Sequence, residues 1–440
     1  MWVAGRGYSL FHGMNSGPIE TTGQRTLLDY MLELSGKNYP YDMVQVRYTI
    51  GGDNGPTDPK LPGFVKAWNE TFESPRLVID TADALFEAFE RRYGAKLPEL
   101  RGDMTPYWED GAVSSAAEEA MVRAAARRLQ QAETLWAMRN PGAFPARAFT
   151  DAWRQVLLWH EHTWGAADSV GQPDRKDVVE QWEYKRAFAL ESDKQSRALL
   201  DAAAPPPGPA FEVVNTLSWS RDAVVFLPAA ATKGRDRVVD AAGRTVQSQR
   251  LGDGRLAARL QVPALGAIRI RCVPGPGMMA NGPIAGNAPV VATKTSLDNG
   301  LLRVEVDPKT GDIRSLTSYK MSGRQFVREG AGLNAYLYVL GRDPSAAVGS
   351  GVPTTKIVDA GPIVATLEIS STAPGASRLV RRVSLAMQAD GVDIETTIDK
   401  TLVREKESAH LAFPLNVPGG IVRADLGEAV VEFEKDQLPG

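Results

Sequence analysis

Cysteine is almost absent from this chain, because among its 440 residues only Cys272 carries a thiol. A single cysteine excludes an internal disulfide and a cysteine-based zinc site. Cys272 lies in the apolar run Ala267–Val273, which predicts a buried residue that behaves as a small hydrophobe. A catalytic thiol needs a base beside it, and nothing near Cys272 in the sequence supplies one.

An excess of either charge is also lacking, since 50 basic residues stand against 53 acidic ones and the net charge is −3. The basic pairs Arg127-Arg128 and Arg381-Arg382 are too short for a nucleic-acid-binding stripe and are typical of a solvated face. We therefore expect no nucleic-acid partner. The oligomeric state, including a homo-oligomer, stays open.

No apolar run approaches the ~18–20 residues that span a bilayer, so no membrane partner is expected. Met1–Met14 contains no basic stretch followed by an apolar one, and we infer no signal peptide in the chain as it starts here. A cytoplasmic location is then the default, while the N-terminus of a longer parent enzyme would decide its compartment. The length predicts about two to four domains.

Residues 1–100 alternate between helix and strand signals, which is typical of parallel βαβ units. The expected helices are Thr26–Leu34, Leu61–Phe72 and Thr81–Arg92, and the expected strands are Met43–Ile50 and Arg76–Asp80. A parallel sheet of two or three strands leaves its edges open and one face uncovered. We therefore interpret residues 1–100 as the remnant of a larger α/β domain.

Residues 101–204 carry helical patterns, and short connections between them predict a three-helix bundle. Ser115 and Glu118 form a possible capping box for a helix that continues to Met138. The two other helices are expected at Pro145–His160 and Asp174–Ala203. On the second helix one apolar face is expected to hold Phe149, Trp153, Val156, Leu157 and His160.

After the proline-rich linker 205–209, short alternating segments predict an antiparallel all-β region. Gly252-Asp253-Gly254 indicates a hairpin between Val246–Leu251 and Leu256–Val262. A second linker near 275–289 separates a small β domain, 210–275, from a β-sandwich, 290–440. The expected fold class is thus multidomain, with an α/β part, an all-α part and an all-β part.

The four histidines are His12, His160, His162 and His410, and two of them lie in the segment Trp159–Ala166. His160 falls in the last turn of its helix, where an imidazole is expected to point into the interior. A core histidine and a metal ligand are both consistent with this position. His160 and His162 are two residues apart and cannot share a helical face, so other ligands must come from elsewhere.

Three acidic positions are also candidates for chemistry. Asp53, in the turn Gly51–Pro56, and the carboxylates Asp103 and Asp110 all lie in segments where Asp favours turns and caps. Catalytic carboxylates occupy the carboxyl ends of α/β-barrel strands, and Asp53 follows an expected strand. Both interpretations stay open for Asp53, and a structural role is the simpler one for Asp103 and Asp110.

Several of these segments, in this order, resemble glycoside hydrolase family 38. The segment Gly102–Gly111 is similar to the family's entry into its helical domain, and Val214–Trp219 is similar to the start of its first β domain. Leu297–Gly300 with Thr310–Ile313 resembles the start of its large C-terminal sandwich, which implies a mutarotase-like sandwich. The remnant at residues 1–100 then corresponds to part of the family's α/β barrel.

The resemblance also implies roles for three residues. Aligned through Gly165, His160 falls on the family's zinc-ligating histidine and Glu161 on the carboxylate that contacts the sugar hydroxyls. Gly51-Gly52-Asp53 resembles the segment whose last aspartate is the proposed general acid/base. The implied enzyme is a retaining α-mannosidase that acts on α-mannosides or mannose-containing oligosaccharides and uses Zn²⁺ or another divalent cation. Retention needs the two catalytic carboxyl groups about 5–5.5 Å apart.

Two parts of the family pattern have no counterpart here. These are the histidine-any-aspartate zinc pair and the nucleophilic aspartate, and both would lie before Met1. The chain also stops where family members continue through the sandwich. We therefore expect a fragment, truncated at both ends and inactive alone. The alternatives are a non-catalytic carbohydrate-binding or scaffold protein and another sandwich-bearing enzyme such as a polysaccharide lyase.

Overall fold

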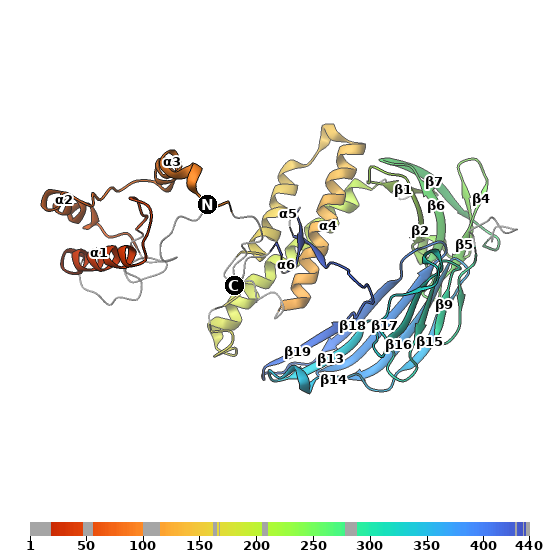
Figure 1. The fold of residues 1–440 in the computed structure, drawn as a ribbon. Coiled ribbons are helices and arrows are strands. Elements are labelled where there is room, and N and C mark those ends of the chain that lie inside the picture. Colours follow the sequence, from red (N-terminus) through yellow and green to blue (C-terminus); the bar gives the residue numbers. More distant parts are fainter. Residues whose placement is uncertain are drawn as a thin grey trace. The chain divides into compact units, whose positions relative to one another are not determined.

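The computed structural model combines helices with several antiparallel sheets (Figure 1). It describes residues 19–46, 56–99, 115–161, 165–166, 168–204, 210–277, 288–426, 429–433 and 435–436. The chain divides into two compact units, which are described separately. The first contains the described residues of 19–99 together with 435–436. The second contains those of 115–433.

Three helices and one 3₁₀ turn make up the first unit between residues 19 and 99. They are α1 (Ile19–Gly36), α2 (Leu61–Thr71), α3 (Ala82–Tyr93) and η1 (Gly94–Lys96). Phe89 of α3 is fully buried, and the Tyr41 ring packs edge-on against it with ring centroids 4.9 Å apart. The predicted helices at 26–34, 61–72 and 81–92 are therefore confirmed.

The strand predicted at Arg76–Asp80 is wrong, since these described residues form no strand. The side chain of Asn69 makes the two backbone hydrogen bonds that a neighbouring strand would otherwise make with Leu77. Its Nδ2 donates to the Leu77 carbonyl and its Oδ1 accepts from the Leu77 N–H, both at 2.9 Å. Of the other predicted strand, Met43–Ile50, residues 43–46 are irregular and the rest lies outside the described residues.

The second unit begins with three helices that pack against one another. They are α4 (Ala116–Arg139), α5 (Ala146–Trp159) and α6 (Lys176–Ala203), with the 3₁₀ turn η3 (Pro141–Ala143) between the first two. Their shared core includes Val122, Leu129, Phe149, Val156 and Leu199. All three predicted helices are confirmed to within two residues at each end.

The capping box predicted at the start of α4 is wrong. Ser115 is the N-cap residue, but its side chain accepts no hydrogen bond from the helix, and its buried Oγ has no partner among the described residues. Glu118 instead reaches across to α6, where its Oε1 lies 3.3 Å from Nε of Arg186. The carboxylate therefore pairs with a neighbouring helix rather than with its own N-terminus.

Two small sheets follow the helices and pack around one core. The first has the order β1-β7-β3-β4 and the second β2-β6-β5. Their strands are β1 (Phe211–Asn215), β2 (Arg221–Leu227), β3 (Arg237–Asp240), β4 (Thr245–Val246), β5 (Ser248–Arg250), β6 (Leu256–Val262) and β7 (Gly266–Val273), and α7 (Ala229–Thr232) follows β2. Both sheets contribute to the core. The first sheet provides Val238 on β3 and Ile270 on β7, and the second provides Leu227 on β2 and Leu256 on β6.

Larger antiparallel sheets make up residues 288–433. The sheet orders are β12-β11-β10-β9-β8, β15-β16-β17-β18, β14-β13-β19 and β20-β21. The strands are β8 (Val291–Ala292), β9 (Ser296–Asp298), β10 (Leu302–Val306), β11 (Ile313–Ser318), β12 (Arg324–Gln325), β13 (Ala335–Leu340), β14 (Val348–Gly349), β15 (Thr354–Ala360), β16 (Val364–Ala373), β17 (Ala376–Ala386), β18 (Asp393–Lys400), β19 (Glu407–Ala412), β20 (Arg423–Leu426) and β21 (Ala429–Glu432), with short 3₁₀ turns η4 (Tyr319–Met321) and η5 (Pro344–Ala346). The antiparallel all-β prediction is confirmed, as is the hairpin, in which β5 pairs with β6.

One apolar core joins the five-stranded and four-stranded sheets. Leu297, Val304 and Ile313 come from the former, and Leu367 and Val383 come from the latter. The core is continued by Leu251 and Ala257 of the smaller pair of sheets. The buried amide of Gln249 links the two parts, since its Oε1 accepts from the Ile363 and Val364 N–H groups at 2.8 and 2.9 Å.

One buried cation fixes the turn between β10 and β11. The Arg381 side chain is 1% exposed, and its guanidinium donates to Asp312 Oδ1 at 2.6 Å and to the Thr310 carbonyl at 2.7 Å. Gly311 passes so close that a Cβ there would lie 2.3 Å from Arg381 Nη2, and its φ is +78°. Glycine is thus required at this position by both space and backbone conformation.

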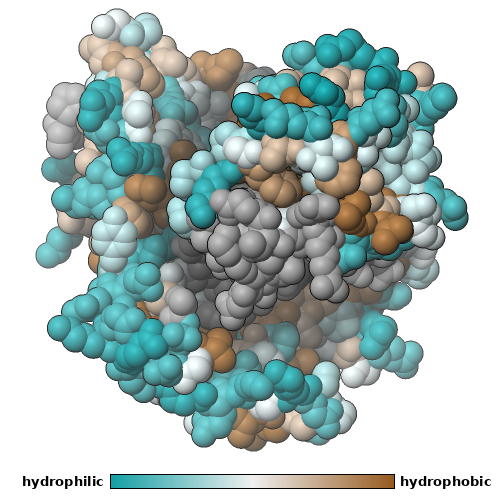
Figure 2. All heavy atoms as spheres, turned by 90° about the vertical axis from the view of Figure 1, so that its left-hand side faces the viewer, coloured by the Kyte–Doolittle hydropathy of each residue, from teal (hydrophilic) through white to brown (hydrophobic). Residues whose placement is uncertain are grey.

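One face of the molecule is drawn by the polarity of its side chains in Figure 2. On the face drawn in Figure 2, hydrophilic side chains predominate and apolar ones are scattered between them. Among the described residues, no helix combines the length and the apolar character that crossing a membrane requires.

Candidate functional site

The last turn of α5 places His160 at the edge of the helical core. His160 is the C-cap residue, and its N–H donates to the Val156 carbonyl at 3.2 Å. Its side chain is 36% exposed, so the prediction that the imidazole points into the interior is wrong. Trp159 takes the inward position instead and is 2% exposed, because the buried face of α5 consists of Phe149, Ala152, Val156 and Trp159.

The predicted apolar face of α5 is therefore only partly correct. Phe149 and Val156 are buried as expected, and Trp153 is half-buried. Leu157, however, is 68% exposed. The buried face is rotated toward Ala152 and Trp159, which belong to the core that α4, α5 and α6 share.

Glu119, in the first turn of α4, lies next to His160. Its Oε2 accepts a hydrogen bond of 3.1 Å from Trp159 Nε1 and lies 3.7 Å from His160 Nδ1. An acidic side chain in a first turn is stabilised by the positive end of the helix dipole. The start of α4 therefore provides a carboxylate that faces the imidazole at the end of α5.

Glu161, the next residue, is held by a buried lysine from α6. The Lys185 side chain is 8% exposed, and its ammonium pairs with Glu161 Oε1 and donates to the Leu158 carbonyl at 3.2 Å. That carbonyl belongs to the last turn of α5, where main-chain oxygens lack helical partners. The ammonium thus fixes both the helix end and the carboxylate, which stays 39% exposed.

Gly165 lies directly against Trp182 of α6. A Cβ on this residue would lie 2.4 Å from the Trp182 ring, and the Gly165 φ is +101°. Trp182 Nε1 in turn donates to Ser169 Oγ at 2.9 Å. The glycine through which the family alignment is made therefore has a local structural reason, since any other residue would push the segment off α6.

The described residues around His160 do not complete a catalytic zinc site. They bring His160 and Glu119 together, whereas three protein ligands are usual. Glu161, the other carboxylate nearby, is paired with the Lys185 ammonium, whose positive charge opposes a cation. No group of three or more His, Cys, Asp or Glu side chains suited to a metal occurs in the described part of the chain.

The remaining candidates fall in different places. Asp53, Asp103, Asp110, His12 and His162 lie outside the described residues. His410 lies on β19 with an exposed ring, whose Nε2 is 2.9 Å from Ser408 Oγ. Cys272 is buried in the core of the small sheets, as predicted, and burial raises the pKa of its thiol. This suits a small hydrophobe better than a nucleophile.

Lys185 is the site residue that sequence reasoning missed. It lies on the buried stripe of α6, seven residues after Val178 and four before Ala189. A lysine on a helical stripe of otherwise uncharged residues is a detectable signal, because a buried ammonium needs an acidic or carbonyl partner.

Comparison with protein-family models and with curated proteins finds no match for this chain.

Proposed function

We propose that the chain is part of a retaining α-mannosidase of the glycoside hydrolase family 38 type. In this proposal Glu161 contacts the sugar hydroxyls, His160 is a metal ligand and Asp53 is the general acid/base. The observation that carries the proposal is the Glu161 carboxylate, which Lys185 holds beside His160 while 39% of the side chain stays exposed. A fixed and accessible carboxylate is suited to accept hydrogen bonds from a sugar.

The fold supports the same proposal at a finer level. We assign α4, α5 and α6 to the family's three-helix bundle, residues 210–275 to its small β domain and residues 290–440 to its mutarotase-like sandwich. Residues 1–100 then correspond to part of the α/β barrel. The support comes from the order of helices before antiparallel sheets and from Gly165, which lies directly against Trp182 of α6.

A second candidate function is carbohydrate binding without turnover. It is favoured by the two donors, His160 and Glu119, that the described residues provide where a catalytic zinc needs three.

Binding of methyl α-D-mannopyranoside to the purified chain, followed by ligand-observed NMR, tests the part that both candidates share. We expect Glu161→Gln to weaken binding at least about tenfold, which corresponds to about 1.4 kcal/mol. Glu180→Gln is the matched control, because Glu180 also lies on a helix of this unit, pairs with Lys176 at 3.5 Å and has 65% of its side chain exposed. Equal loss in both variants, or no loss in either, contradicts the proposed role of Glu161.

Hydrolysis of 4-nitrophenyl α-D-mannopyranoside tests whether this chain contains a complete catalytic centre. We expect no turnover by the 440-residue chain with or without added Zn²⁺. Zinc-dependent turnover that is lost in Asp53→Asn would show a complete catalytic centre, and the expectation of an inactive chain would then be wrong.

A further inference from the structure

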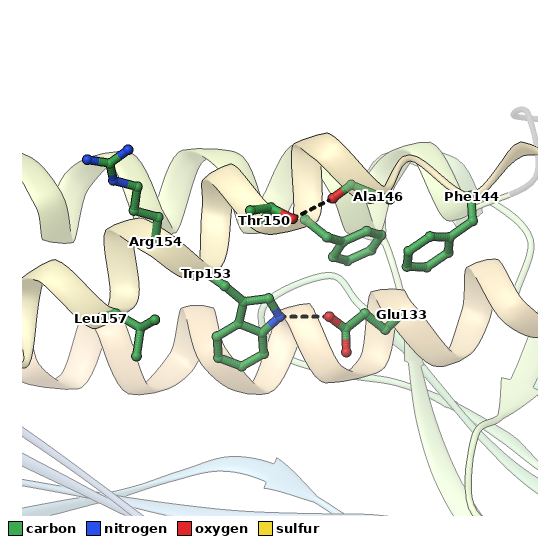
Figure 3. A pocket seen from close by; sticks show the side chains of 8 residues that line it. Glu133, Phe144, Ala146, Thr150, Trp153, Arg154 and Leu157 are labelled. Atoms are coloured by element: carbon green, nitrogen blue, oxygen red, sulfur yellow. Dashed lines mark hydrogen bonds between the residues drawn. The ribbon is translucent and has the colours of Figure 1, made fainter. Parts of the chain in front are cut away.

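A separate open groove lies along the outer side of α4 and α5 and has a volume of about 570 Å³ (Figure 3). This falls within the range of about 300–1,000 Å³ that is usual for small-molecule sites. The side chains that matter for its chemistry are Glu133, Phe144, Phe149, Trp153, Arg154 and Leu157. They come from α4, from the end of η3 and from α5, so the groove is built within one helical hairpin.

Aromatic rings form much of the groove. The rings of Phe144 and Phe149 are stacked, with centroids 4.8 Å apart and planes 6° from parallel. The Trp153 indole follows one turn along α5, half-buried, and its Nε1 donates to Glu133 Oε1 at 2.7 Å. Because this bond fixes the orientation of the indole, the groove presents a preformed ring surface rather than a mobile side chain.

Glu133 supplies the polar group of the groove. Its carboxylate is half-buried, and within the described chain it forms no ion pair. Arg154 also lines the groove, but Figure 3 shows its guanidinium pointing away from the indole. The groove therefore offers aromatic faces together with one carboxylate that can accept further hydrogen bonds.

We propose that this groove binds a neutral hexopyranose, stacked on Trp153 and hydrogen-bonded to Glu133. A pyranose has a face of C–H bonds, which is attracted to the negative face of an aromatic ring. It also has hydroxyl groups that donate to a carboxylate. An acyl chain would fill the apolar part but bury the carboxylate without a donor, which is unfavourable.

Binding of methyl β-D-glucopyranoside, detected by saturation-transfer NMR, tests the proposal. The equatorial hydroxyls of this sugar leave flat C–H faces for stacking. We expect Trp153→Ala to weaken binding at least about tenfold, equivalent to about 1.4 kcal/mol. Trp153→Phe keeps a ring and is expected to fall between this variant and the wild type. Glu133→Gln keeps an acceptor for the indole N–H, and weaker binding there would assign the ligand contact to the charged carboxylate.

Trp219→Ala is the matched control, because Trp219 is an exposed tryptophan, 59% accessible, of the same unit outside the groove. We expect it to leave glucoside binding unchanged. Three results would overturn the proposal: no saturation transfer to the wild type, unchanged binding in both Trp153 variants, or equal loss in Trp219→Ala. The Glu161 proposal stands or falls separately, since its variants concern another site.

Two further measurements test whether the groove instead binds a cation or a second copy of the chain. If tetramethylammonium binds and displaces the sugar, the groove is a cation site and the proposal is wrong. If light scattering shows a dimer that Trp153→Ala dissociates, the groove is a contact between copies of the chain and the proposal is equally wrong. The proposal is supported if the protein is a monomer, does not bind tetramethylammonium, and binds the glucoside through Trp153.

Discussion

The helical and the β-sheet regions of the second unit each contain a buried cation, and the two cations differ in how exposed their acidic partners are. In the helices, Lys185 is 8% exposed and pairs with Glu161, whose side chain is 39% exposed. In the sheets, Arg381 is 1% exposed and pairs with Asp312, which is 18% exposed and belongs to a tight turn. Each cation also donates to a main-chain carbonyl, Leu158 in one case and Thr310 in the other.

The two pairs differ in whether the carboxylate is accessible to a ligand from solvent. Asp312 serves the turn that Gly311 closes against the Arg381 guanidinium, so this pair is part of the architecture. Glu161 is fixed by its cation but remains accessible, so this pair can serve a ligand. Burial of a cation alone does not indicate function, and exposure of its partner is the more informative observation.

The largest expected effect is on the Arg381 pair. Arg381→Leu leaves Asp312 without its counter-ion in a turn that is mostly enclosed, and removal of one partner of a buried pair costs about 3–5 kcal/mol. Arg382→Leu is the matched control, since Arg382 pairs with Glu368 at 2.8 Å but is 48% exposed. Urea unfolding is expected to show a loss for the control below about 1 kcal/mol. Equal losses would remove the contrast between the two regions.

The next effect concerns Gly165. Gly165→Ala introduces a Cβ 2.4 Å from the Trp182 ring at a φ of +101°, and a residue held in such a conformation costs about 1–3 kcal/mol before the clash is counted. Gly171→Ala, whose Cβ would meet nothing within 4 Å, is the control and is expected to change the midpoint of thermal unfolding little. A stable Gly165→Ala protein with unchanged Trp182 fluorescence would contradict this anchoring.

A smaller effect is expected at Lys185. In Lys185→Met, Glu161 loses its ammonium partner but can be hydrated, so the loss of unfolding free energy lies near the low end of about 1–3 kcal/mol. The control is Lys194→Met, because Lys194 pairs with Glu191 at 3.3 Å and is 76% exposed. The sharper contrast is in mannoside binding, which only Lys185→Met should weaken. If both variants bind mannoside equally well, Lys185 does not position Glu161 for a ligand.

The smallest effect depends on pH. A hydrogen bond from Arg197, at 2.9 Å, and the nearby Arg128 guanidinium hold the pKa of Asp193 below its ordinary value of 3.8. Because the folded-state pKa is the lower one, the pair stabilises the protein above the ordinary pKa, and this stability is lost as the pH falls through the folded-state pKa. The midpoint temperature of thermal unfolding should therefore be lower for Asp193→Asn than for the wild type at pH 7. This difference in midpoint should shrink in acid. A difference that grows in acid would contradict the shift.

The regular elements were predictable wherever local signals agreed with tertiary packing. The hairpin of β5 and β6 follows from Gly252-Asp253-Gly254, where Gly254 has a φ of +85°. The three helices follow from their apolar period and from Asn140-Pro141-Gly142 between the first two. In each case the residues that decide the structure are neighbours in the sequence.

Errors arose where a tertiary contact or a side-chain hydrogen bond decided the outcome, rather than the local periodic pattern. Asn69 satisfies the backbone at Leu77, so an extended segment needs no sheet. Arg186 attracts Glu118 away from the capping position, and Trp159 takes the inward place expected for His160. The position of Lys185 beside Glu161, 24 residues away, likewise depends on the packing of α5 against α6. Local patterns do not contain these contacts.

The most direct test of the account is the preference of the Glu161 site between two epimers. Methyl α-D-mannopyranoside and methyl α-D-glucopyranoside differ only at C2, and the comparison is made in the Trp153→Ala background so that the groove does not contribute. We predict that the mannoside binds at least about tenfold more tightly, a difference of about 1.4 kcal/mol, and that Glu161→Gln abolishes the preference. Equal affinity for the two epimers, or a preference that survives Glu161→Gln, would contradict the assignment of Glu161 to a mannosidase-type site.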